Sequence, residues 1–123
     1  MGMGAARILI VDDHVLFRSS ARRMLESHGF VVIGESGDGS SAIMAVRTLR
    51  PDVVLLDVQL PDMNGFEVAR QLAEEPDAPA VILTSIRDAS DYRTRLAGTP
   101  ARGFIPKAEL SEPRITALLA GAP

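Results

Sequence analysis

The chain has 123 residues, of which 46% are hydrophobic and 24% charged, a composition that predicts one soluble domain with a sizeable aliphatic core. It contains no cysteine, which excludes a disulfide framework, a thiolate zinc site and thiol catalysis. The net charge of −3 gives no electrostatic reason for nucleic-acid binding, and no apolar run reaches the length of a membrane span, so we expect a cytoplasmic protein without direct nucleic-acid or membrane partners.

The first predicted element is a strand that ends in two acids. Residues 7–11 are almost wholly apolar, as expected of a strand buried on both faces, and Asp12 and Asp13 follow directly. Either acid could simply cap the helix that comes next. We expect His14, which follows the acids, to be a turn residue rather than a metal ligand.

A helix, a second strand and a second helix come next. The first helix is indicated by residues that recur at helical spacing: Phe17, Ala21, Met24, Leu25 and His28. Gly29 should end it, because glycine readily adopts the left-handed backbone found at helix C-termini. Residues 30–33 predict a strand and residues 34–39 a turn region. Residues 42–49 again have helical spacing, and Pro51 marks the end of that helix.

The most informative stretch surrounds Asp57. Four aliphatic residues precede it and predict a strand buried on both faces. Open α/β sheets bind ligands at the carboxyl ends of their strands, which is where the Asp57 carboxylate should lie. Pro61, Asn64 and Gly65 then predict a turn and a third helix with Asn64 as its N-cap. Capping of this turn is the plainer alternative role for Asp57.

The next two elements are a strand and a weak helix. Residues 80–83 predict a fourth strand that ends in Thr84 and Ser85. Residues 86–97 are mostly polar, so we expect only a short or irregular helix, in which Tyr92 and Leu96 could face a core.

Residues 103–107 predict a short fifth strand. Its Pro106 cannot donate a ladder hydrogen bond, so the strand should lie at an edge of the sheet. Ser111 can cap a last helix, whose buried face would hold Ile115, Leu118 and Leu119. Because strand and helix alternate five times, we predict a parallel sheet with helices on both faces. We expect one domain at 6–120, a disordered tail at 1–5, and a tail or linker start at 121–123.

Five polar side chains should meet at one rim of this sheet, because the carboxyl ends of parallel strands share one edge. They are Asp12, Asp13, Asp57, Thr84 and Lys107. Clustered carboxylates repel one another, and hard oxygen ligands favour Mg²⁺ or Mn²⁺. Lys107 adds a second positive charge and Thr84 a hydroxyl donor. Together these groups fit phosphoryl transfer to an aspartate nucleophile.

In this order, the motifs closely resemble the receiver domain of bacterial two-component response regulators. The resemblance covers roughly residues 6–119 and rests on the following motifs: Asp12-Asp13, Asp57, Leu60-Pro61-Asp62-Met63-Asn64-Gly65, Thr84-Ser85 and Gly103-Phe104-Ile105-Pro106-Lys107. The Asp-Asp-His triplet and the run at 101–110 look most like receivers of regulators with a helix-turn-helix output. The resemblance implies a flavodoxin-like, doubly wound, five-stranded parallel sheet of order 2-1-3-4-5 and a role in transcription regulation.

The resemblance also implies a role for each acid. Asp57 would be the phosphoacceptor, which receives its phosphoryl group from a sensor histidine kinase. Asp13 would bind Mg²⁺ directly and Asp12 largely through water. The Asp57 carboxylate and the backbone carbonyl of Gln59 would complete the protein ligands.

The remaining implied roles concern the response to phosphorylation. Lys107 would pair with the phosphoryl oxygens, Thr84 would move to hydrogen-bond the phosphorylated Asp57, and Phe104 would follow inward as an aromatic switch. The chain would catalyse only its own phosphorylation and slow dephosphorylation. Its further partner would be an output domain or a downstream protein. Ala108 departs from the family, in which a proline with a cis bond usually follows the lysine.

Three other functions remain open from the sequence. A receiver-like interaction module that no longer uses phosphate would keep the same fold. A Mg²⁺-dependent phosphatase of the haloacid dehalogenase type would place a second aspartate where this chain has Gln59 and would need a substrate-covering cap, for which the chain has no room. A flavin-binding module would meet repulsion between its phosphate and the Asp12-Asp13 pair.

Overall fold

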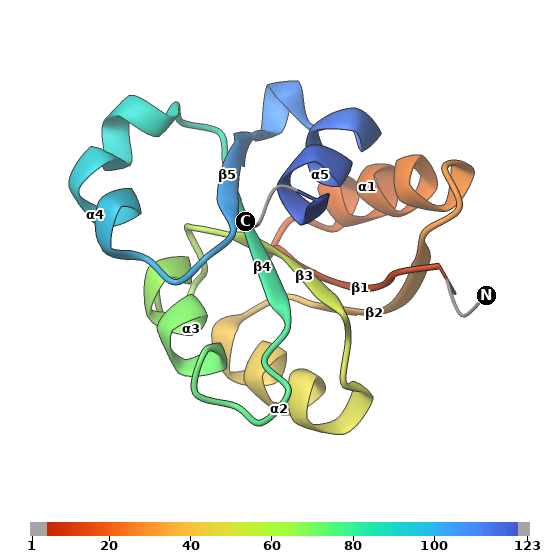
Figure 1. Ribbon diagram of the computed structural model, residues 1–123, viewed down its shortest axis with the longest axis horizontal. Helices are drawn as coiled ribbons and strands as arrows, with labels where there is room; N and C mark the ends of the chain where they lie inside the picture. Colours follow the sequence, from red (N-terminus) through yellow and green to blue (C-terminus); the bar gives the residue numbers. More distant parts are fainter. Residues whose placement is uncertain (1–4, 121–123) are drawn as a thin grey trace.

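The computed structural model describes residues 5–120 and contains a five-stranded parallel sheet of order β2-β1-β3-β4-β5, as predicted (Figure 1). The expectations for residues 1–4 and 121–123 lie outside the described residues. The elements in chain order are β1 (Arg7–Val11), α1 (Val15–Ser27), β2 (Val31–Ser36), α2 (Gly39–Leu49), β3 (Val53–Asp57), α3 (Gly65–Leu72), β4 (Ala80–Ser85), the 3₁₀ helix η1 (Ala89–Tyr92), α4 (Arg93–Gly98), β5 (Gly103–Pro106), the 3₁₀ helix η2 (Lys107–Glu109) and α5 (Glu112–Ala120).

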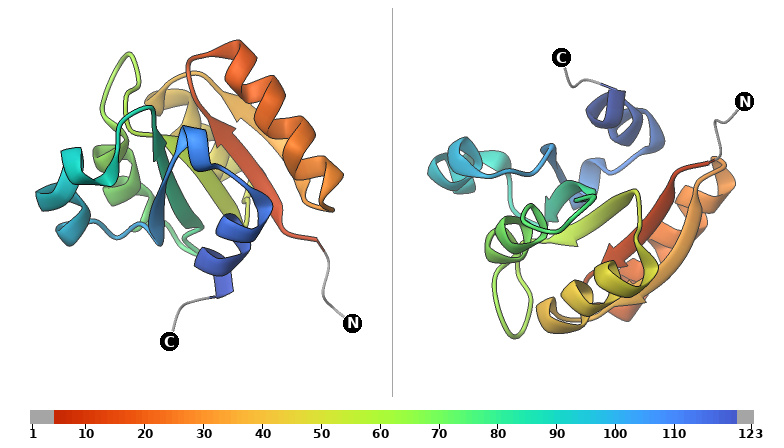
Figure 2. Two further views of the ribbon diagram at one scale, coloured as in Figure 1. Left: turned by 90° about the horizontal axis from the view of Figure 1, so that it is seen from above. Right: turned by 60° about the horizontal axis from the view of Figure 1, so that its bottom comes forward.

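The strands divide their side chains between two hydrophobic cores. On one face, Leu9, Val54 and Leu83 pack with residues of α2 and α3. On the other, Ile8, Leu55, Ile82 and the partners from α1 and α5 form a second core. Figure 2 shows α1 and α5 together on one face and α2 and α3 on the other. This two-sided burial explains why the strands read as continuous apolar runs rather than alternating ones.

The second strand is longer than predicted. It continues through Ser36, and Gly34 pairs with Leu9 of β1 inside the ladder. The expected turn at residues 34–39 was therefore wrong in its first half. A Cβ atom at Gly34 would lie only 3.0 Å from Cδ1 of Leu49, so this glycine makes room for the helix that packs above it. Gly34 thus indicates close packing between strand and helix rather than a turn.

The predicted caps at Asn64 and Gly29 and the predicted edge strand are confirmed. Asn64 accepts a hydrogen bond from the Glu67 amide at 2.9 Å, and Gly29 follows α1 with a φ of +90°. Pro106 lies in β5, at the edge of the sheet. In addition, Asp62 accepts hydrogen bonds from the amides of Gly39 (2.8 Å) and Ser40 (2.9 Å). The loop after β3 is thereby tied to the N-terminus of α2.

The segment between β4 and β5 is short and irregular, as expected. It consists of η1 and the six-residue α4, and neither contains a buried residue. Tyr92 and Leu96 nevertheless pack against the core on the α2–α3 side. The ring of Tyr92 lies 5.6 Å from that of Phe66 and 5.7 Å from that of Phe104, between centroids. We call Phe66, Tyr92 and Phe104 the aromatic row.

None of the helices within residues 5–120 has both the length and the apolar character needed to cross a membrane. The Lys107–Ala108 peptide bond is trans, since the described residues contain no cis bond.

Candidate functional site

The carboxyl ends of four strands meet at one rim of the sheet. Asp12 directly follows β1, Asp57 is the last residue of β3, and Lys107 directly follows β5. In the β3–β4 ladder Asp57 is the register partner of Thr84. The topology thus brings together side chains that are far apart in the sequence, as the strand-end pattern predicted.

Lys107 neutralises two buried carboxylates. Its Nζ lies 2.6 Å from Oδ2 of Asp12 and 3.5 Å from Oδ2 of Asp57. Asp12 and Asp57 are 0% and 3% exposed, and the Lys107 side chain is 11% exposed. The ammonium also lies 4.4 Å from the centroid of the Phe17 ring, at cation–π distance. Lys107 therefore pairs more closely with Asp12 than with Asp57, the expected acceptor.

The Asp57 carboxyl has an unusual proton affinity. Burial, and then the nearby charge of Asp12, raise its pKa from 3.8 to about 6. A hydrogen bond from the Gln59 amide at 3.2 Å and the charge of Lys107 act in the opposite direction. A carboxylate held in such a site gains from any further positive charge placed beside it.

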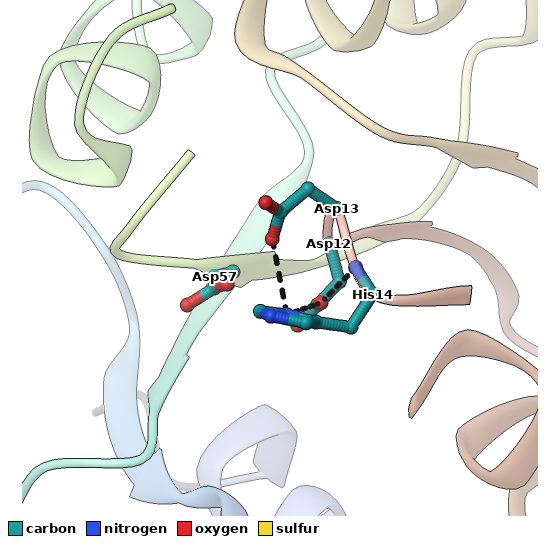
Figure 3. Close-up of side chains that lie close together, drawn as sticks. All are labelled: Asp12, Asp13, His14 and Asp57. Atoms are coloured by element: carbon teal, nitrogen blue, oxygen red, sulfur yellow. Dashed lines mark hydrogen bonds and ion pairs between the residues drawn. The ribbon is translucent and has the colours of Figure 1, made fainter. Parts of the chain in front are cut away.

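The acids form a cluster suited to a divalent cation (Figure 3). Asp12, Asp13, His14 and Asp57 each offer a ligand atom, and these four atoms lie within 4.8 Å of one another. Oδ2 of Asp12 is buried and, apart from its ion pair with Lys107, accepts no hydrogen bond from the described residues. Three carboxylates in this arrangement fit Mg²⁺ or Mn²⁺ by their oxygen chemistry. The side chain of Gln59 is exposed, and its backbone lies in the loop directly after Asp57.

The Thr84 hydroxyl is buried beside the acids. Thr84 is 1% exposed, and Oγ1 forms no hydrogen bond with the described residues. Buried hydroxyls are normally hydrogen-bonded, because an unpaired one costs about 1–3 kcal/mol. This hydroxyl is thus a free donor next to Asp57.

Phe104 lies beside the site rather than in it. It is half-buried, pairs with Leu83 in the ladder, and belongs to the aromatic row. The hydroxyl of Tyr92, its neighbour in the row, lies 2.8 Å from Oγ of the buried Ser85. The row is therefore connected by one hydroxyl contact to the residue that follows Thr84.

Two residues near the acids were missed by sequence reasoning. Arg18, in α1, donates a hydrogen bond from an η nitrogen to the backbone carbonyl of Asp12 at 2.6 Å, and its Nε lies 2.9 Å from Glu35. Glu35 also pairs with Arg22, and this hydrogen bond is the main cause that lowers the pKa of Glu35. Phe17, which the sequence placed only in a core, contacts Lys107. The sequence around Arg18 and Phe17 does not indicate these contacts, because both depend on how α1 packs against the sheet.

Comparisons with known proteins identify a family. A sequence-family model described as "Response regulator receiver domain" matches residues 8–120. The transcriptional regulatory protein DegU of Brevibacillus brevis is 36% identical over 102 residues, which cover 82% of this chain and 43% of DegU. The response regulator GacA of Pseudomonas aeruginosa is 35% identical over 114 residues, or 91% of this chain and 53% of GacA. The chain thus spans about half the length of these relatives.

A solved receiver-domain structure is also similar to this chain. The signal receiver domain of the response regulator NarL from Mycobacterium tuberculosis superimposes with a TM-score of 0.83 at 30% sequence identity, and the match covers 94% of this chain and 98% of that domain.

Proposed function

The chain belongs to the response regulator receiver family, and from this premise we propose that it is a phosphorylation-dependent signalling switch with Asp57 as its phosphoacceptor. The observation that carries the proposal is the placement of Asp57. Its carboxylate is buried and faces Lys107 at 3.5 Å, and Asp57 is the register partner of Thr84, whose hydroxyl forms no hydrogen bond within residues 5–120. We take the switch domain to be residues 6–120.

In the proposed reaction, a carboxylate oxygen of Asp57 attacks the phosphorus of a phosphohistidine on a sensor histidine kinase. An O–P bond forms, the N–P bond breaks, and the kinase imidazole leaves with the bonding electron pair. Lys107 needs only a small movement from Asp12 toward Asp57 to pair with the phosphoryl oxygens. Charge neutralisation on the phosphoryl group is what Mg²⁺ or Mn²⁺ supplies when held by Asp12, Asp13, Asp57 and the Gln59 carbonyl.

The switch itself uses the free hydroxyl of Thr84. A phosphoryl oxygen on Asp57 gives this hydroxyl an acceptor, which lowers the free energy of the conformer in which Thr84 reaches toward Asp57. Phe104 then occupies the space that Thr84 leaves. Phosphorylation thereby shifts a two-state equilibrium that exists before the modification.

The proposal makes the chain a signalling protein rather than an enzyme with an external substrate. Its only chemistry would be its own phosphorylation and slow dephosphorylation. The protein would act in the cytoplasm, and its partners would be a sensor histidine kinase and an output domain or downstream protein that acts on transcription, as the name of its relative DegU, a transcriptional regulatory protein, suggests. The described residues would not contact nucleic acid directly.

The test is the intact mass after incubation with Mg²⁺ and acetyl phosphate. Wild type should gain one phosphoryl group, and the gain should vanish in Asp57→Asn and after chelation of the metal. Asp77→Asn, at an exposed site, is the matched control and should be modified like wild type. Modification of Asp57→Asn at the wild-type rate would refute the assignment. Wild type that binds Mg²⁺ but accepts no phosphoryl group from acetyl phosphate or from a histidine kinase would favour the phosphate-independent interaction module. Repeated turnover of a phosphomonoester would favour the phosphatase.

A further inference from the structure

The imidazole of His14 lies against two of the acids. Its Nδ1 lies 3.1 Å from Oδ1 of Asp12 and 3.0 Å from Oδ1 of Asp13. Figure 3 shows the imidazole joined to both carboxylates by these two contacts. Ligand atoms that bind one small dication at about 2.1 Å, at right angles to each other, are themselves about 3.0 Å apart. The nitrogen therefore lies at the spacing of a neighbouring ligand from each of the two oxygens.

The ring is held against the acids by its hydrogen-bond and ion-pair contacts to Asp12 and Asp13, and not by helix capping or by packing. His14 is the N-cap residue of α1, but its side chain makes no capping hydrogen bond. The side chain is 68% exposed, so packing does not hold it against the acids. The backbone amide of His14 donates to Oδ1 of Asp12 at 2.8 Å, which fixes the start of the side chain beside the pocket. The sequence expectation of a turn residue describes the backbone of His14 but not its imidazole.

A nitrogen ligand changes which ion the pocket prefers. Mg²⁺ binds carboxylate and carbonyl oxygens and water, whereas imidazole suits Mn²⁺, Co²⁺, Ni²⁺ and Zn²⁺. Two aspartates with one histidine form a mixed nitrogen and oxygen set that favours the later transition metals. Oδ2 of Asp12, the other oxygen of this carboxylate, already faces one cation, since the Lys107 ammonium lies 2.6 Å away.

We propose that His14 is a ligand of the ion at Asp12 and Asp13, so that the pocket selects transition-metal dications over Mg²⁺. The inference rests on the metal site of the proposed function but concerns a residue and a specificity outside that proposal. In the cell, the loaded ion would then depend on the supply of transition metals as well as on Mg²⁺.

The experiment compares metal binding by wild type, His14→Asn and His28→Asn. His28 is the matched control, because it is the only other histidine of the chain and lies at the opposite end of α1. Calorimetric titrations of the chelator-treated protein with Zn²⁺, Co²⁺ and Mg²⁺ give the three affinities. We expect His14→Asn to weaken Zn²⁺ and Co²⁺ binding by roughly tenfold or more and Mg²⁺ binding by less than about threefold. His28→Asn should leave all three affinities unchanged.

A spectroscopic readout separates a ligand from a residue that only positions the acids. With Zn²⁺ bound, the imidazole ¹⁵N resonances of His14 should move to the position of a metal-bound nitrogen, while those of His28 should not. Equal losses of Mg²⁺ and Zn²⁺ affinity in His14→Asn, or unchanged His14 resonances, would overturn the inference while leaving Asp57 phosphorylation intact. Absence of binding by any ion, with no phosphorylation of Asp57, would instead remove the proposed function.

Discussion

At the scale of single residues, the buried carboxylate of Asp57 is a source of instability when no cation is bound. The folded protein holds a proton on this group more tightly than the unfolded chain does, because the pKa rises from 3.8 to about 6. The free energy of unfolding should therefore fall as the pH rises through this range, and the full loss should be present above it. A cation bound beside Asp57 would reduce this loss of stability.

Replacement of Asp57 by asparagine should accordingly stabilise the metal-free protein. At neutral pH we expect Asp57→Asn to raise the free energy of unfolding by roughly 1–3 kcal/mol, since the burial of an ionised group and its repulsion from Asp12 are both removed. Urea denaturation in the presence of a chelator measures this. The gain should shrink as the pH falls toward the ordinary pKa of aspartate and disappear below about pH 3, where the folded and the unfolded state both bind the proton. A gain of the same size at both pH values would show that ionisation is not the cause.

The unpaired hydroxyl of Thr84 leads to a second prediction. Thr84→Val keeps the shape of the side chain and removes the buried donor, so it should stabilise the unphosphorylated protein by about 1 kcal/mol. Thr84→Ser keeps the hydroxyl and loses a buried methyl group, so it should destabilise. Denaturant midpoints of the two variants provide the comparison. A valine variant less stable than wild type would mean that the hydroxyl has a partner, such as a bound water.

The site residues differ in how far the sequence could predict them. Asp12, Asp57 and Thr84 were predictable because strand ends of a parallel sheet share one rim. The preference of Lys107 for Asp12 was not, since it depends on the path of one side chain between two acids. Phe104 was named only through the family resemblance. His14 was visible in the sequence next to two acids, but adjacency along the chain gave no information on where its ring points.

At the scale of elements, the start of α3 lies unusually close to the end of β3. A Cβ atom on Gly65 would lie 2.4 Å from the backbone oxygen of Asp57 and 2.9 Å from Cα of Val58. The Gly65 amide donates to the carbonyl of Val58 at 2.6 Å. Only glycine permits this approach, and the backbone of Asp57 is held by it.

Gly65→Ala should therefore be strongly destabilising. The added methyl group meets backbone atoms that cannot rotate away, and we expect a loss of roughly 2–4 kcal/mol. Gly98→Ala in α4 is the matched control, because nothing lies within 4 Å of its Cβ position. That variant should be neutral or slightly stabilising. Thermal denaturation of both variants measures the difference. Similar midpoints would mean that the backbone after β3 shifts at little cost to accommodate the added methyl group.

The elements themselves were predictable where the local signals agreed. Apolar runs and caps located the other strands and the first three helices, because two-sided burial and helix termination are encoded locally. The extension of β2 past Gly34 was not, since a glycine reads as a turn unless the helix packed above it is known. The weakness of α4 followed directly from its polar sequence.

At the scale of the whole molecule, folding gathers the carboxylates of Asp12, Asp13 and Asp57 at one rim of the sheet. Their mutual repulsion opposes folding, and the burial of the two hydrophobic cores must outweigh it. A bound dication stabilises the folded state alone, by about 2.7 kcal/mol at a free concentration one hundred times its dissociation constant. We expect Mg²⁺ to raise the melting temperature of wild type measurably above that in chelator.

The same titration in Asp13→Asn should show a much smaller shift, since a proposed direct ligand is removed. A monovalent salt at equal ionic strength is the control for general screening. Equal shifts with the monovalent salt, or in Asp13→Asn, would indicate that the ion acts through bulk electrostatics rather than at the acidic cluster.

The overall architecture was the most predictable level. Five alternations of strand and helix and a proline in the last strand led to the observed strand order once the family was recognised. The part that remained beyond the sequence is the coupling between layers, such as the tie from Asp62 to α2 and the contact from Tyr92 to Ser85.

The aromatic row has one practical consequence. The chain contains a single tyrosine and no tryptophan, so its ultraviolet emission comes almost wholly from Tyr92. That ring lies between Phe66 and Phe104, with its hydroxyl on the residue after Thr84. If phosphorylation moves Thr84 and Phe104, the intensity and lifetime of this emission should change with them. The protein thus carries its own unlabelled optical reporter, in contact with Phe104 and with the residue after Thr84.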